Sequence, residues 1–113
     1  MHKILKLYAS FFSKGFVYGK LYKIDWYPGV KLSKKNKTKV FGEVYLLKNP
    51  KKVLNILDEY EECSNKFKKP YEYRRVKTDV YTKKGKIKAW IYEYNRRVFE
   101  KDRIKSGQFK RSF

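Results

Sequence analysis

Residues 49–62 read NPKKVLNILDEYEE, and the rest of the chain can be interpreted outward from them. Asparagine followed by proline favours a helix start, because Asn49 can cap free N–H groups and Pro50 lacks the N–H that a first helical position leaves unpaired. Apolar side chains then recur at helical spacing: Val53, Leu54, Leu57 and Tyr60. The stretch therefore predicts a short amphipathic helix that buries one face.

The C-terminal end of this predicted helix is strongly acidic. Residues 58–62 hold four acids, in a chain with 30 Lys and Arg and only 11 Asp and Glu. Negative charge at a helix C-terminus opposes the helix dipole. Composition favours a solvated helix end whose acids pair with lysines, and the alternative is that one acid serves as a base in a reaction.

The length predicts one domain over residues 1–113, and the balance of strands and helices expected below makes it α+β. The hydrophobic fraction is 42% and the aromatic fraction 19%, which is enough for a core and too much for a disordered chain. The formal net charge is +19, which suggests an anionic partner, above all nucleic acid. An AT-rich coding sequence gives the same Lys- and Tyr-rich composition, so both explanations stay open.

Several classes of site and location are poorly supported by the residues present. The single Cys63 cannot form an intrachain disulfide, and neither a signal peptide nor an apolar run of membrane-spanning length is found, so we expect a cytoplasmic protein. One His, His2, with one Cys makes neither a zinc site nor a His-dependent nucleophile. No glycine-rich phosphate loop occurs either. Carboxylate base chemistry, or binding, remains.

Periodicity places the other elements. Apolar residues at helical spacing predict a helix over 2–13, with Gly15 as its left-handed cap. We expect strands over 16–24, 38–47, 72–82 and 87–95, a Pro-Gly turn over 25–29, a hairpin turn over 83–86, and basic loops over 31–39 and 63–71. Strands outnumber helices, which indicates a curved, mostly antiparallel sheet.

Seven short segments occur in the order and spacing of one known family: GKLY (19–22), YPG (27–29), VFGEVY (40–45), LDEYE (57–61), YRRV (73–76), AWIY (89–92) and IKSG (104–107). Over these segments the chain resembles gamma-glutamyl cyclotransferase-like proteins. The resemblance implies a small β-barrel with flanking helices. It also implies an enzyme that releases 5-oxoproline from a γ-glutamyl amine or amide.

In that family the last acid of a Leu-Asp-x-x-Glu motif is the catalytic base, and the resemblance assigns this role to Glu61. The chemistry is economical, because the substrate's own α-amino group attacks its γ-carbonyl and the two groups are already tethered. One carboxylate can take a proton from the ammonium and pass one to the leaving amine. We therefore expect no cofactor and no metal.

Three other residues are candidates for the site. Glu43 shares a strand face with Phe41 and Tyr45; if that face is inward, Glu43 is either a second site acid or a buried structural acid bonded to an Arg. Trp26 and Tyr27 flank the Pro-Gly turn. They either line the mouth of a substrate pocket or pack in the core.

The family opens with a strand ending in a Tyr-Gly-Thr/Ser-Leu loop, which this sequence lacks. Either the true start codon lies upstream, or the chain is naturally truncated. In the second case we expect a barrel without its first strand, with reduced or lost activity, and an exposed sheet edge through which the chain could oligomerise. The resemblance favours a γ-glutamyl small molecule or peptide as partner, with no membrane. The alternative is a basic nucleic-acid-binding module without catalysis.

Overall fold

The computed structural model describes residues 7–35, 37–60 and 72–109. Within these ranges the strands and the helix that are complete follow in the order β1 (Ala9–Lys23), β2 (Pro28–Leu32), β3 (Lys39–Leu47), α2 (Pro50–Tyr60), β4 (Tyr73–Thr82) and β5 (Gly85–Tyr94). A short 3₁₀ helix, η1 (Glu100–Asp102), lies in the tail. No helix in the described ranges is long and apolar enough to cross a membrane.

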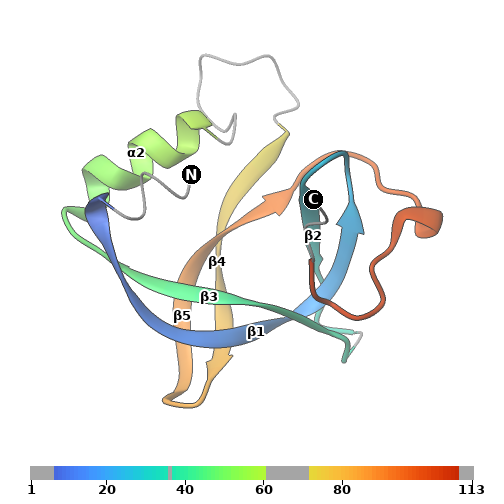
Figure 1. Ribbon diagram of the computed structural model, residues 1–113, viewed down its shortest axis with the longest axis horizontal. Coiled ribbons are helices and arrows are strands. Elements are labelled where there is room, and N and C mark those ends of the chain that lie inside the picture. The colour runs from blue at the N-terminus through green and yellow to red at the C-terminus, as the bar shows by residue number, and fades with distance from the viewer. Residues whose placement is uncertain (1–6, 36, 61–71, 110–113) are drawn as a thin grey trace.

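The sheet is built on β1. This strand pairs antiparallel with β2, β3 and β4, and β4 pairs antiparallel with β5. Only two residue pairs join β1 to β4, namely Gly15 with Thr82 and Phe16 with Tyr81. The sheet curls strongly without closing into a barrel, and α2 lies at one end of β1 and β3 (Figure 1). The predicted α+β class with a curved antiparallel sheet is confirmed, but the barrel is open.

One face of the curled sheet carries the core. Val17 and Leu21 on β1 pack with Val30, Val40 and Val80 from three neighbouring strands, and all five are buried. Burial of each such side chain contributes about 1.5–3 kcal/mol to the free energy of unfolding. Because strand side chains alternate, the neighbours of these residues point to the opposite face.

The tail completes the edge of the sheet beside β3. The Ile104 N–H donates to the carbonyl of Leu21 at 2.7 Å, and the Phe41 N–H donates to the carbonyl of Gly107 at 2.9 Å. Gly107 has φ +71, and a Cβ there would clash with the Lys39 carbonyl. Glycine is therefore required at this contact.

The helix expected over 2–13 is wrong for its described second half. Leu7 and Tyr8 are helical, but Ala9 begins β1, and Gly15 is a strand residue rather than a helix cap. Pairing with β3 over Ala9–Phe11 decides the outcome. Apolar residues are so frequent over 2–13 that they match a helical period by number alone, and aromatic residues also favour strands.

The Pro-Gly turn is also misplaced by the sequence pattern. The chain turns over residues 24–27, and Pro28 and Gly29 already pair with Lys23 and Tyr22 as the first residues of β2. Lys31 and Leu32, which were expected in a basic loop over 31–39, are therefore the last two residues of β2. By contrast, the strands over 38–47, 72–82 and 87–95 and the hairpin with Gly85 at φ +112 are confirmed to within two residues at each end.

Candidate functional site

The helix α2 confirms the prediction from residues 49–62 over Pro50–Tyr60, and residues 61 and 62 lie outside the described part of the chain. The carbonyl of Asn49 accepts a hydrogen bond from the Val53 N–H at 3.2 Å, and Asn49 itself adopts φ +53, which asparagine tolerates better than most residues. Val53, Leu54 and Leu57 are buried, so the predicted apolar face is the packed one.

Asp58, the acid of the Leu-Asp-x-x-Glu motif nearest to Leu57, ties the C-terminal half of α2 to the β4–β5 hairpin. Its Oδ1 accepts a hydrogen bond from the Tyr92 hydroxyl at 2.7 Å and lies 3.0 Å from Arg75 Nε. Arg75 and Tyr92 are direct cross-strand partners. Only 18% of the Asp58 side chain is exposed, so this contact is sheltered and fixes the helix against the sheet.

A second cluster lies one side-chain repeat further along the same strand face, about 7 Å away. The cross-strand pair there is Tyr73 with Tyr94, and both are buried. The Tyr27 hydroxyl donates a hydrogen bond to Glu72 Oε2 at 2.5 Å, and Arg96 Nη1 lies 3.8 Å from the same oxygen. The hydrogen bond to the Glu72 carboxylate, helped by burial, raises the pKa of Tyr27 well above its ordinary value.

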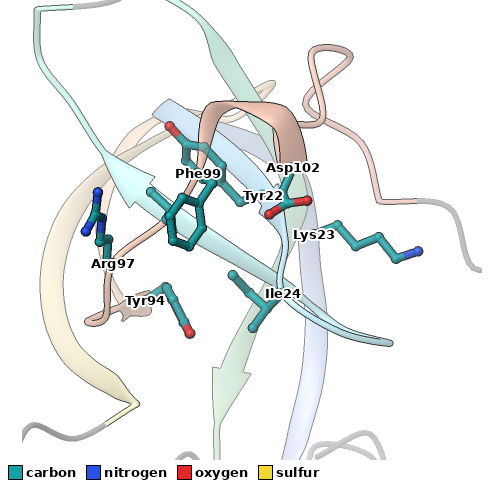
Figure 2. Close-up of a pocket in the computed structure, with 8 residues that line it drawn as sticks. Tyr22, Lys23, Ile24, Tyr94, Arg97, Phe99 and Asp102 are labelled. Atoms are coloured by element: carbon teal, nitrogen blue, oxygen red, sulfur yellow. The ribbon is translucent and has the colours of Figure 1, made fainter.

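A cavity of about 190 Å³ opens beside Tyr94, between the end of β1 and the tail. Figure 2 shows Phe99 between Tyr22 and Tyr94 in this view, while the Lys23 side chain points away. Burial, followed by the charge of Glu72, raises the pKa of Tyr94. Tyr94 packs edge-on against Tyr73 at 5.4 Å between ring centroids, and the Tyr73 ring lies 6.4 Å from that of Tyr27, so ring contacts lead from the cavity to Tyr27.

Of the predicted site residues Glu61, Trp26 and Tyr27, the structure describes the last two. Glu61 lies outside the described residues. Trp26 is 64% exposed and packs edge-on against Tyr27 at 5.2 Å between ring centroids, so it is not a core residue. Tyr27 is half-buried and meets Glu72, a residue 45 positions away that the sequence did not single out.

The inward face on which both expectations for Glu43 depended is not observed, and the buried structural role is wrong. That strand face points away from the core, Glu43 is exposed, and it accepts a hydrogen bond from the Tyr45 hydroxyl at 2.8 Å. The buried structural acid bonded to an Arg is instead Glu93, 6% exposed, which accepts bonds from the Leu32 N–H at 2.8 Å and from Arg74 Nε at 2.9 Å. The sequence signal was its position two residues beyond Ile91, on the apolar face of β5.

Charge and donor chemistry limit what the site can hold. Across the described ranges, no group of three or more His, Cys, Asp or Glu side chains converges on a point where a metal ion could bind. The two site carboxylates, Asp58 and Glu72, are each matched by an arginine, Arg75 and Arg96. The described part of the site thus combines phenol hydroxyls, carboxylates and guanidinium groups.

Comparison with known proteins gives a consistent result. The model of one family, gamma-glutamyl cyclotransferase, AIG2-like, matches residues 1–111. The chain is also similar to the crystal structure of an uncharacterized protein, PH0828, from Pyrococcus horikoshii, with 27% sequence identity and a TM-score of 0.65 over 96% of this chain and 77% of that chain. No curated protein matches. Since the family model spans nearly the whole sequence, the chain belongs to the AIG2-like gamma-glutamyl cyclotransferase family.

Proposed function

We propose that this protein is a cyclotransferase-type enzyme that releases 5-oxoproline from a γ-glutamyl amine or amide. Membership of the family supports a reaction on a γ-glutamyl small molecule. The observation that carries the proposal is the Leu-Asp-x-x-Glu motif at the end of α2, whose Asp58 is bonded to Tyr92 and Arg75. These contacts fix the C-terminal half of α2, and Glu61 is the next residue in the sequence after the helix.

In the proposed reaction the substrate's α-amino nitrogen bonds to its own γ-carbonyl carbon and closes a five-membered lactam. The bond from that carbon to the leaving amine breaks. Glu61 takes a proton from the α-ammonium group and delivers one to the leaving nitrogen, so that protons balance over the cycle. Neither a cofactor nor an external nucleophile enters the scheme, because the reacting groups are tethered.

We also propose that Trp26 and Tyr27 contact the substrate at the mouth of the site. Trp26 is 64% exposed and packs edge-on against Tyr27, so a substrate held by Tyr27 would also lie close to the indole. The Tyr27 hydroxyl is oriented by Glu72. Arg96, beside Glu72, adds a positive charge that suits the α-carboxylate of a γ-glutamyl group.

The test is the release of 5-oxoproline, measured by mass spectrometry, from a panel of γ-glutamyl-amino acids and γ-glutamyl-ε-lysine. Glu61→Gln keeps the size of the side chain and removes the base. We expect it to lower kcat by roughly 10²- to 10⁴-fold, the usual contribution of a general acid–base. The matched control is Glu62→Gln, which removes the same charge one residue later.

Two results would count against this proposal. Equal rates for the wild type and Glu61→Gln would remove Glu61 from the chemistry. No release from any member of the panel, by a chain shown to be folded by circular dichroism, would remove the activity itself.

A further inference from the structure

A row of aromatic side chains crosses three strands on the face opposite the core. Phe41 on β3, Phe16 on β1 and Tyr81 on β4 are direct cross-strand neighbours. Phe16 and Tyr81 stack at 5.3 Å between centroids with 17° between their planes, and Tyr18 packs edge-on against both rings. Phe41 is 45% exposed, although burial of so large an apolar side chain is favourable.

Positive charge surrounds this row. Lys39 Nζ lies 4.5 Å from the ring centroid of Phe16, and Lys37 Nζ lies 5.1 Å from that of Tyr18. Strand alternation places four more lysines on the same face: Lys14, Lys77, Lys86 and Lys88. Two strand acids share the face, and both have partners: Glu43 accepts a bond from Tyr45, and Asp79 lies 2.8 Å from Lys88. Asp58 of α2 also reaches this face, where it is bonded to Tyr92 and Arg75.

A second aromatic position lies further along the same face. Trp90 is 46% exposed and pairs across the strands with Lys77, whose Nζ lies 5.1 Å from the indole. Lys77 and Tyr81 are four residues apart on β4, a separation of about 13 Å. The face therefore offers two aromatic positions with cations beside each.

We infer that this aromatic–basic face, defined by Phe16, Tyr18, Phe41, Tyr81, Trp90 and the six lysines, binds single-stranded nucleic acid. Exposed rings on a sheet can stack with bases, and lysines beside them can contact phosphates. The exposed rings of Phe41 and Trp90 are of little use to an acidic peptide, which needs only the charges. The net charge of +19 adds a general attraction for polyanions.

The charge component is tested by fluorescence anisotropy of a short labelled oligothymidylate over a range of salt concentrations. Each phosphate contact contributes about −0.7 to the slope of log affinity against log salt for a single strand. The double variant Lys37→Ala/Lys39→Ala is expected to flatten the slope by about 1.4. The control Lys51→Ala/Lys52→Ala, on exposed positions of α2 beyond the far end of β3, should leave the slope close to that of the wild type.

The stacking component is tested with Phe41→Leu and Phe41→Trp, since leucine keeps the apolar bulk and loses the ring. We expect the leucine variant to weaken binding roughly 5- to 150-fold, which corresponds to one stacked base, and the tryptophan variant to retain it. Thermal unfolding confirms that each variant is folded. Retained affinity in Phe41→Leu, equal effects of the two lysine pairs, equal binding of a poly-glutamate peptide, or no binding at low salt would each overturn the inference.

Discussion

The two contacts of Asp58 that join α2 to the sheet lead to the most precise prediction about the stability of the site. Asp58→Asn preserves the shape of the side chain and removes its charge. The lost contacts are those to the Tyr92 hydroxyl at 2.7 Å and to Arg75 Nε at 3.0 Å. A hydrogen bond to a charged group contributes about 1.5–3 kcal/mol, and the asparagine oxygen can still accept one neutral bond.

The net loss in the free energy of unfolding should therefore be about 2 kcal/mol, which is roughly 8 °C in Tm for a domain of this size. Urea unfolding and calorimetry measure both quantities. Tyr92→Phe, which removes one donor, should cost about 1 kcal/mol. The double variant should show an interaction energy, because the two residues share one bond.

The matched control is Asp79→Asn, the same substitution in an ion pair whose lysine partner, Lys88, is 68% exposed. Solvent screens such a pair, so its loss should change stability less than Asp58→Asn does. If Asp58→Asn unfolds at the same urea concentration as the wild type, the contact does not hold the helix. If the two aspartate variants behave alike, shelter from solvent is not what gives the Asp58 contact its strength.

Further predictions concern backbone contacts, the buried acid and pH. Gly19→Ala should destabilise the fold by about 1–3 kcal/mol, because its Cβ would clash with a backbone carbonyl. Gly42→Ala is the control: nothing lies within 4 Å of the new Cβ, so its stability in urea should be nearly unchanged or slightly higher. Glu93→Gln should lower the free energy of unfolding by about 2 kcal/mol, since a buried charge-assisted network is weakened. Because the folded state raises the pKa of Tyr27, its hydrogen bond to Glu72 stabilises the protein fully below the ordinary tyrosine value of 10.0 and is lost as pH rises through the raised value. Stability should therefore fall above pH 10, and less steeply in Tyr27→Phe.

Local signals explain which elements could be predicted. Each element that was predicted correctly is specified by residues close to it in sequence: α2 by its Asn-Pro start and apolar spacing, β3 by its alternation, and the hairpin by Gly85. Residues 9–13 belong to an equally strong helical pattern over 2–13, yet they pair with β3 across more than thirty positions. A long-range partner thus overrode a local period.

Some features of the site could likewise be predicted from the sequence, and others depend on contacts between distant residues. The motif acid Glu61 was proposed from a resemblance that the family match supports. The contact between Tyr27 and Glu72 joins residues 45 positions apart, and no pattern within either segment specifies it. Glu43 and Glu93 are both strand acids, and only the inward or outward sense of each strand distinguishes them. That sense is set by packing, which single-strand alternation leaves two-fold ambiguous.

The narrow connection between β1 and β4 has a consequence for how the chain folds. The β4–β5 hairpin and the β1–β2 hairpin each join residues close in sequence, whereas Phe16 and Tyr81, which unite the two parts, are 65 positions apart. Closing so long a loop costs entropy before any contact repays it. The β1–β4 pairs, the Tyr27–Glu72 bond and the Leu32–Glu93 bond all join the two hairpins across long loops, so the protein should fold more slowly than either hairpin would alone.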